Sequence, residues 1–189
     1  IPNSVTAAQK EVGFISLSGK PVRPELEQSL NRNLETKTIA FVYLGVFDSS
    51  RVQWRQLAEM RDTVFLTRDP IREEMAADNL VVLDERFSFP DLIASADVVV
   101  TKAGYSTLAT AFNHGKPVLS CEREDFSEYR AMKRFMEEQK VGRIISSEEF
   151  FAGQWAGELE QTLKLDVRGK VRLNGAEEVA GIIGRYLDS

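Results

Sequence analysis

The sequence predicts an α/β domain built around a parallel sheet of about six strands. Short apolar runs that are too hydrophobic for half-exposed strands recur along the chain, and polar, helix-like stretches separate most of them. Crossovers between parallel strands are right-handed, so these elements should form a doubly wound, Rossmann-like sheet. The strands are expected at residues 38–44, 63–67, 80–83, 97–101, 117–121 and 142–145.

The remaining stretches have the capping residues and the Pro or Gly boundaries that are typical of helices. Residues 1–36 are interpreted as an inter-domain linker segment with a short helix, and residues 37–189 as the main domain. Helices are expected at residues 24–33, 52–60, 70–78, 90–95, 105–114, 127–139, 147–164 and 175–187.

Composition excludes several classes of function. A formal net charge of -5 argues against a nucleic-acid partner. The single cysteine, Cys121, and the single histidine, His114, predict no intrachain disulfide and no structural metal site, and His114 is expected to serve the end of a helix. No apolar run reaches the roughly 20 residues that a transmembrane helix needs. We therefore expect a cytoplasmic protein without a transmembrane segment, a metal or a cofactor.

The loop at residues 101–107 is the first candidate site, because ligands of open parallel sheets bind beyond the carboxyl ends of strands. A buried strand turns there through a glycine into a helix whose first N–H groups are free to bind a diphosphate. An ordinary capped helix start explains the same local pattern. The residues expected to contact the nucleotide here are Lys102, Gly104, Tyr105, Ser106 and Thr107.

Two further loops follow buried strands. The loop at residues 44–50, with Gly45 and Val46, precedes another helix and is expected to face the first loop across a cleft, although neither G-x-G-x-x-G nor a Walker A sequence is present. The acidic stretch at residues 122–129 has carboxylates that can accept hydrogen bonds from sugar hydroxyls, and it also fits a solvated helix start.

The order and spacing of these segments resemble the C-terminal domain of GT-B glycosyltransferases. The peptidoglycan N-acetylglucosaminyltransferase group and the glycosyltransferase-like region of plant L-arabinokinases are the most similar, over roughly residue 19 to the C-terminus. The segments that carry the resemblance are residues 18–23, the Gly45 loop, and residues 96–107, 115–117, 125–129 and 151–155.

The resemblance implies a role for each matching position. Gly104, Ser106 and Thr107 would bind the diphosphate of a nucleoside-diphosphate sugar, usually a UDP-sugar, and Arg23 would approach the same diphosphate from the domain junction. Phe87 would lie near the base. The residues that would lie near the donor sugar are Asp125, Ser127 and Glu128.

Two positions depart from the family pattern. Thr110 stands where the family has a ribose-binding glutamate, and a threonine cannot make the bidentate contact to a ribose diol. Ser127 and Glu128 stand where the family has a pair of glutamines. These departures put the affinity for the donor, the identity of the base and the activity itself in question.

The resemblance implies a glycosyltransferase domain that binds a UDP-sugar as donor substrate. The acceptor site and the general base would lie in an N-terminal domain that this sequence lacks, so the isolated chain should bind nucleotide weakly and not turn over. Two alternatives stay open: a non-catalytic sugar-nucleotide-binding or regulatory domain, and an enzyme similar to the UDP-sugar 2-epimerases. A generic flavodoxin-like or receiver domain is shorter and has an acidic pair after its first strand.

Overall fold

The predicted parallel sheet is present. The computed structural model describes residues 10–45, 49–123 and 127–187, and these contain a six-stranded sheet in the order β3-β2-β1-β4-β5-β6 with every neighbouring pair parallel. Each strand lies within its predicted range. The strands are β1 (Thr38–Tyr43), β2 (Thr63–Thr67), β3 (Leu80–Val82), β4 (Val98–Thr101), β5 (Val118–Cys121) and β6 (Gly142–Ile145).

The sheet is doubly wound, and its strand order reverses between β1 and β4. From β1 the chain moves outward to β2 and β3, returns to β4 beside β1, and then moves outward in the other direction to β5 and β6. Residues 40–43 of β1 pair with residues 98–101 of β4, so these two strands end side by side. The end of this strand pair is the place where such a sheet binds ligands.

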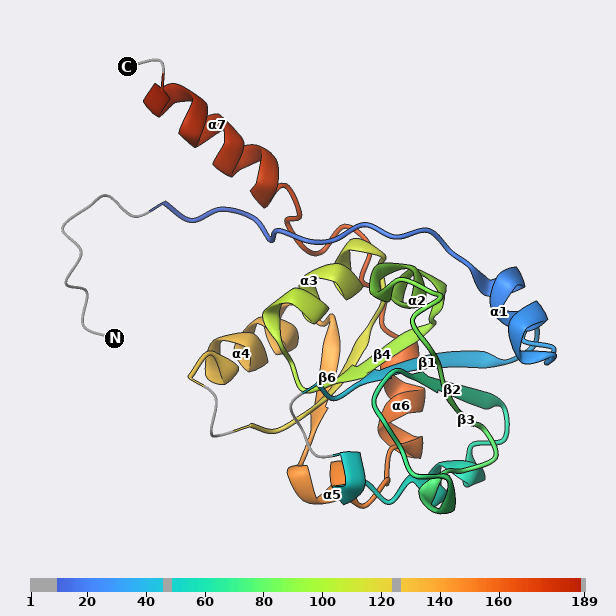
Figure 1. Ribbon diagram of the computed structural model, residues 1–189. Coiled ribbons are helices and arrows are strands. Elements are labelled where there is room, and N and C mark those ends of the chain that lie inside the picture. The colour runs from blue at the N-terminus through green and yellow to red at the C-terminus, as the bar shows by residue number, and fades with distance from the viewer. Residues whose placement is uncertain (1–9, 46–48, 124–126, 188–189) are drawn as a thin grey trace.

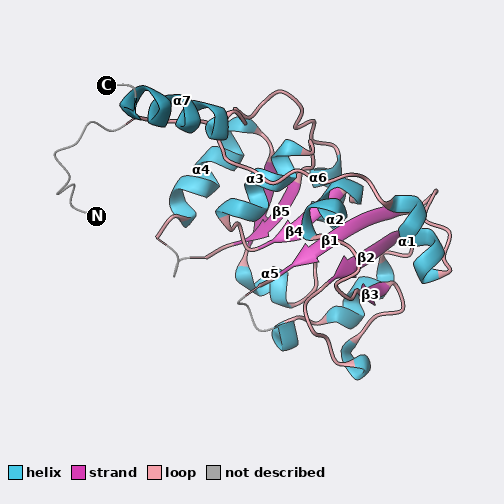
Figure 2. Cartoon of the chain, turned by 45° about the horizontal axis from the view of Figure 1, so that its top comes forward, coloured by secondary structure: helices cyan, strands magenta, loops and turns pink. Residues whose placement is uncertain are grey.

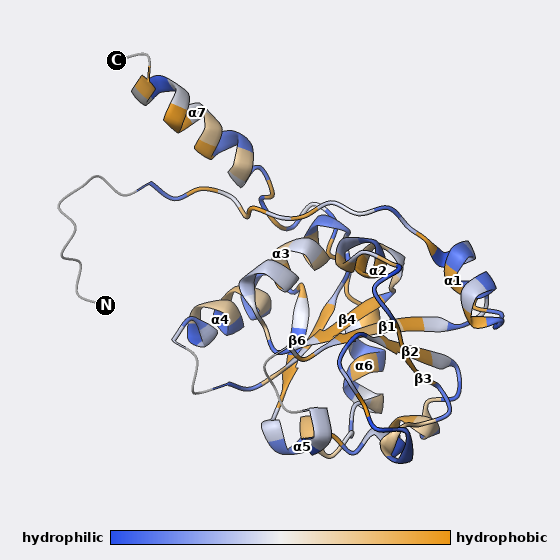
Figure 3. Cartoon of the chain, viewed as in Figure 1, coloured by the Kyte–Doolittle hydropathy of each residue, from blue (hydrophilic) through white to orange (hydrophobic). Residues whose placement is uncertain are grey.

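Helices cover both faces of the sheet (Figures 1 and 2). Strand side chains alternate between two cores: Phe41 and Val99 face one, and Ala40 and Val100 face the other. Figure 3 shows that the strands are mostly apolar, whereas the helices that cover them carry both polar and apolar residues. The first core is covered by α1 (Arg23–Leu30), α2 (Phe89–Ser95), α3 (Tyr105–Asn113) and α4 (Tyr129–Gln139), and the second by α5 (Ser147–Phe151) and α6 (Ala156–Leu163).

Two predicted helices, at residues 52–60 and 70–78, are wrong. These stretches contain only the 3-10 helices η2 (Trp54–Glu59) and η3 (Glu73–Met75), and a further one, η1 (Ser49–Arg51), precedes the first stretch. Hydrogen bonds to neighbouring segments hold the first stretch in this form: the Trp54 indole donates to the Ser49 carbonyl, and the Gln53 N–H donates to the Phe151 carbonyl.

The helix predicted at residues 147–164 is in fact two helices, α5 and α6. Gly153 adopts a φ of 71° between them, which ends the first helix. Trp155 is then fully buried and packs against the Phe150 ring, with centroids 5.1 Å apart and ring planes 35° apart. Trp155, which lies between the two helices, belongs to the second core.

The N-terminal segment packs onto the domain. Residues 10–22 run across α3 and α2 before the chain enters α1 (Figure 1). Val22 and Leu26 belong to the first core, so this part of the segment assigned to a linker is buried in the domain. At the other end, α7 (Gly175–Leu187) projects from the body (Figure 1). None of the described helices is long and apolar enough to cross a membrane.

Candidate functional site

The site begins where β1 and β4 end together. The Thr101 hydroxyl donates to the Tyr43 carbonyl at 2.9 Å, and beyond this bond the two strands lead into separate loops. Both loops turn through the left-handed region, at Gly45 with a φ of 60° and at Ala103 with a φ of 59°. For alanine this conformation costs about 1–2 kcal/mol, and it is tolerated where the surrounding structure fixes the backbone. Ala103 is completely buried, which supplies that restraint.

Lys102 bridges the two loops. Its Nζ atom lies 2.8 Å from the position that a Cβ atom on Gly45 would occupy. Any side chain at residue 45 would therefore displace the ammonium group, and it would also strain the positive φ. The sequence-based prediction that the two loops face each other agrees with this contact. Val46, the other residue predicted in the first loop, lies outside the described residues.

Asp69 fixes the backbone of the first loop, and the sequence analysis did not identify it as a functional residue. Asp69 is only 7% exposed, and its carboxylate accepts a hydrogen bond from the Leu44 N–H at 2.6 Å. Burial raises the pKa of Asp69, whereas hydrogen bonds from the Leu44 and Gly45 backbone and the charge of Lys102 act in the opposite direction. The available signal was its place two residues after β2, the strand next to β1.

The start of α3, three residues after Lys102, presents free N–H donors. The first intrahelical bond runs from the Leu108 N–H to the Gly104 carbonyl, and no side chain caps the helix. The N–H groups of Tyr105, Ser106 and Thr107 therefore have no acceptor among the described residues. A Cβ atom on Gly104 would meet nothing within 4 Å, so space is open in front of this helix start. Such a start attracts anions.

Lys102 interacts with charges of both signs at this edge. Burial lowers the pKa of the Lys102 ammonium, the nearby charge of Arg123 lowers it further, and Asp69 opposes both. A bound anion would reverse this shift, because it would stabilise the charged form. Lys102 and Arg123 follow the adjacent strands β4 and β5, so both cations lie at the carboxyl edge.

Aromatic residues line the same end of β1. Phe87 is half-buried against the first core, and Phe89 packs its ring on Tyr43 with centroids 4.8 Å apart. Tyr105 is committed elsewhere: its hydroxyl accepts a hydrogen bond from the Ile15 N–H, and its ring stacks on Phe14. The Tyr105 side chain thus anchors the N-terminal segment, and only its backbone N–H faces the candidate site.

The predicted donor-sugar residues follow β5. Ser127 and Glu128 are exposed, and Glu128 precedes the first residue of α4. Both therefore come after the carboxyl end of the strand next to β4, on the same side of the sheet as Lys102. Asp125 lies outside the described residues.

Arg23 does not join this group. Its guanidinium donates to the Asp97 carboxylate at 2.7 Å and to the Lys37 carbonyl at 3.1 Å. Asp97 precedes β4 and also accepts the Ile39 N–H, so the whole cluster lies at the amino ends of the strands. The six residues of β1 separate it from Gly45 by about 20 Å at a rise of roughly 3.3 Å per residue. The geometry thus corrects the expectation of a diphosphate contact for Arg23.

Thr110 is also unavailable to a ligand. It is fully buried, its hydroxyl donates to the Ser106 carbonyl at 2.9 Å, and the Leu17 N–H donates to it at 3.4 Å. The N-terminal segment covers it, so the expected ribose contact is corrected as well. His114 does mark the end of α3, but as an acceptor for the Gly19 N–H; burial lowers its pKa, which favours this neutral role. No group of three metal-ligand side chains gathers within the described ranges.

Comparison with known proteins agrees with this architecture. No protein-family model matches the chain. The L-arabinokinase of Arabidopsis thaliana is 28% identical over 116 residues, which are 59% of this chain and 11% of that protein.

Three solved structures illustrate the structural likeness. The calicheamicin glycosyltransferase CalG4 superimposes with a TM-score of 0.66 at 15% identity, over 93% of this chain and 46% of that one. MurG of Acinetobacter baumannii superimposes with a TM-score of 0.64 at 16% identity, over 97% of this chain and 58% of MurG. The glycotransferase of kitacinnamycin superimposes with a TM-score of 0.63 at 16% identity, over 82% of this chain and 44% of that one. The chain spans about half the length of these proteins, and its fold is that of one half of a GT-B glycosyltransferase.

Proposed function

We propose that this chain is the donor-binding domain of a glycosyltransferase and that its donor is a nucleoside-diphosphate sugar, specifically a UDP-sugar. One observation carries the proposal: three N–H groups at the start of α3, unpaired among the described residues, lie next to open space at Gly104, at the place where the strand order reverses and just after Lys102 in the chain. The glycosyltransferase folds of the structural relatives support the same assignment.

The diphosphate would lie between the start of α3 and the Gly45 loop. During transfer the bond between the sugar C1 and the β-phosphate oxygen breaks, and the nucleoside diphosphate leaves with the bonding electrons. The new negative charge develops on phosphate oxygens, where preorganised N–H groups and a lysine stabilise it most. In this proposal the donor is a substrate, and no cofactor takes part.

The acceptor and the general base would come from a preceding domain. Ile183 and Leu187 of α7 are 53% and 81% exposed, and Ile15 and Leu17 of the N-terminal segment are also exposed. Two neighbouring segments thus carry apolar side chains that this chain leaves uncovered (Figure 3). Such a surface suits contact with another domain.

Calorimetric titration of the chain with UDP and with uridine tests the diphosphate site. UDP should bind weakly, at millimolar concentration, and uridine should bind at least tenfold more weakly because it lacks the diphosphate. Equal heats for both ligands, or none for UDP at 10 mM, would contradict the proposal.

A second candidate is a sugar-nucleotide-binding domain that does not catalyse transfer. The buried Thr110 favours it, because no carboxylate stands at this position to hold a ribose diol. The natural gene product should be incubated with UDP-glucose and a mixture of sugar and peptide acceptors, and released UDP measured. Turnover supports the transferase, whereas binding of UDP without turnover supports the second candidate.

A further inference from the structure

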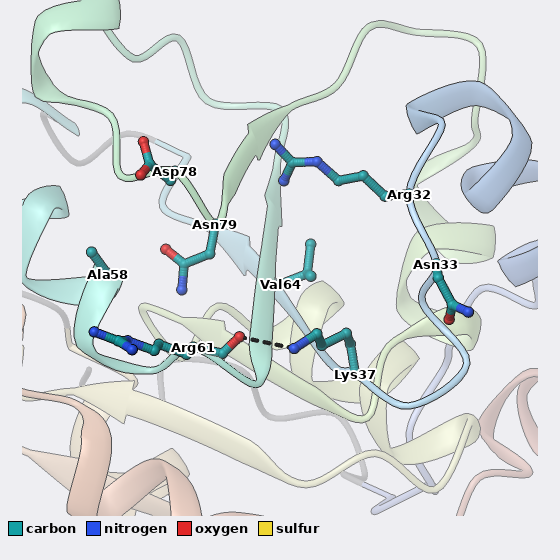
Figure 4. A pocket seen from close by; sticks show the side chains of 8 residues that line it. All are labelled: Arg32, Asn33, Lys37, Ala58, Arg61, Val64, Asp78 and Asn79. Carbon is teal, nitrogen blue, oxygen red and sulfur yellow. Dashed lines mark hydrogen bonds between the residues drawn. The ribbon is translucent and has the colours of Figure 1, made fainter.

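Outside the candidate donor site, the described residues form a hollow at the amino ends of β1 and β2 (Figure 4). Its Arg32 and Arg61 side chains point apart, so the hollow does not bring a set of ligand-binding groups together. The N-terminal segment is different, because a series of polar side chains on and beside two helices binds its backbone.

Residues 15–22, here called the strap, have no regular secondary structure and lie across α3 and α2 (Figure 1). Their backbone N–H groups donate to side chains, and none of them donates to a backbone carbonyl of a described residue. The five bonds run from Ile15 to the Tyr105 hydroxyl, from Leu17 to the Thr110 hydroxyl, from Gly19 to the His114 Nε2, from Lys20 to the Asp91 carboxylate and from Val22 to the Ser95 hydroxyl.

The middle of the strap is held from both sides. A Cβ atom on Gly19 would lie 2.3 Å from the carbonyl carbon of Pro90, so the strap backbone lies directly on the first turn of α2. On the other side, the Asn113 amide of α3 donates to the Leu17 carbonyl at 3.1 Å, and the Gly19 N–H donates to His114 at 3.1 Å. Gly19 is thus fixed between the two helices, with His114 as the acceptor of its N–H.

His114 can accept this hydrogen bond only as a neutral imidazole. An imidazolium carries a proton on both ring nitrogens, so it has no lone pair for the Gly19 N–H. Protonation would therefore place two donors against each other at a partly buried position. Among the five acceptors of the strap, His114 is the one whose ordinary pKa lies between pH 5 and pH 8. The hydrogen bond from the Lys20 N–H holds the pKa of Asp91 below its ordinary value, so that acceptor stays ionised.

Charges of both signs face His114. Burial is the largest influence and lowers the pKa of the imidazole, the Lys116 ammonium lowers it further, and the Asp91 carboxylate of α2 acts in the opposite direction. The strap's own cation, Lys20, interacts with that same carboxylate. The neutral form therefore predominates at pH 7. The bond to Gly19 is fully present above the ordinary pKa of histidine, and it is lost as the pH falls through the lowered pKa.

We propose that protonation of His114 releases residues 17–20 of the strap from α2 and α3, so that the chain contains a pH-dependent switch. The release is local, because the Val22 N–H remains bound to the Ser95 hydroxyl and the Val22 side chain lies in the first core. Ile15 and Leu17, whose exposed side chains lie on the strap, would change position. The switch would thus alter the apolar surface at this end of the molecule. The inference does not rest on the proposed donor site.

Amide hydrogen exchange of the chain, followed by NMR from pH 8.0 to pH 4.5 and corrected for the intrinsic rate, tests the switch. The protection factor of the Gly19 amide should fall roughly tenfold or more as the pH decreases, whereas the amides of Val22 and of α3 should keep theirs. His114 is the single histidine of the chain, so its imidazole signals are assigned directly, and they should titrate over the same pH range as the Gly19 amide.

Two variants separate the switch from general acid sensitivity. His114→Gln supplies an amide oxygen that accepts the Gly19 N–H and does not titrate, so Gly19 should stay protected at every pH. Asp91→Asn keeps an acceptor for the Lys20 N–H but removes the charge that favours the imidazolium, so the loss of Gly19 protection should move to lower pH. Constant Gly19 protection in the natural sequence, the same fall in His114→Gln, or a fall at a different pH from the imidazole titration would overturn the proposal.

Discussion

Both ends of the β1–β4 strand pair contain carboxylate and cationic side chains. At the amino end these side chains hold the structure together, and at the carboxyl end they surround the candidate site. At the amino end, the Asp97 carboxylate accepts from the Arg23 guanidinium and from the Ile39 N–H, each at 2.7 Å, so charge and backbone satisfy each other. At the carboxyl end, Asp69 holds the Gly45 loop from behind while Lys102 reaches over it. A carboxylate tied to the backbone of β1 occurs at both ends, but free N–H groups beside open space occur at the carboxyl end.

This difference shows how a ligand-binding site can be distinguished from a charge cluster that only stabilises the fold. Ionic groups near a strand end do not mark a site when they form a closed cluster, as around Asp97. The carboxyl end is distinguished by donors that the described residues leave unsatisfied and by space in front of them. Substitutions matched between the two ends, or between two helix starts, can break or sharpen the comparison.

The largest effect is expected for Gly104→Asp. A side chain fits there without a clash, but it places a negative charge against the diphosphate, so UDP affinity should fall at least 100-fold. Gly157→Asp is the matched control, because Gly157 lies in the first turn of α6 and its Cβ atom would also meet nothing within 4 Å. Calorimetry should show unchanged UDP binding for the control, and equal losses in both variants would argue against the assigned site.

A smaller effect, about tenfold, is expected for Lys102→Ala, which corresponds to the lower end of the roughly 1.5–3 kcal/mol that hydrogen bonds to charged groups contribute. Lys116→Ala provides the comparison from the amino edge. Burial lowers the pKa of both lysines, but Lys116 precedes β5, close to Asp97 and Arg23. UDP titrations should separate the two variants, and a loss in Lys116→Ala as large as in Lys102→Ala would show that position at the sheet edge does not matter.

Asp69→Ala and Asp97→Ala should both lower the free energy of unfolding, by about 1–3 kcal/mol, because each leaves buried backbone donors unsatisfied. Only Asp69→Ala should also weaken UDP binding, about threefold, through a less ordered Gly45 loop. Urea denaturation measures the first effect and calorimetry the second. If Asp97→Ala weakens UDP binding equally, the carboxyl edge is not special.

The smallest effect concerns pH. The pKa of Lys102 is lowered by burial, so the ammonium loses its proton at a lower pH than an ordinary lysine. The charged form binds the diphosphate, so UDP affinity should decline as pH rises through this lowered pKa. Lys102→Arg keeps its charge and should remove the decline. Titrations between pH 7 and pH 10 check this, and an identical pH profile in the arginine variant would assign the decline to another group.

The sequence was sufficient for the sheet and for the two loops at its carboxyl edge. The strands were predictable because buried parallel strands are continuous apolar runs, and Gly45 and Lys102 follow two of them directly. The conformations of the connections before and after β2 were not predictable. Tertiary hydrogen bonds, such as the one from the Gln53 N–H to the Phe151 carbonyl, outweigh local helix propensity there.

Side-chain roles that depend on long-range contacts were also out of reach. Arg23 and Thr110 were assigned from the resemblance, but the fold pairs the first with Asp97 and buries the second under Leu17. Asp69 lay outside every motif, and its importance comes from a strand neighbour that local sequence does not reveal. Such positions require knowledge of which segments pack together.

The most direct test of the donor site is an amide-resolved NMR titration of the chain with UDP. The account predicts that the largest shifts occur at the N–H signals of Tyr105, Ser106 and Thr107 and at Gly45, with little change at Ile39 and Asp97. Shifts concentrated at the amino ends of the strands, or an α3 start that does not respond to UDP, would contradict it.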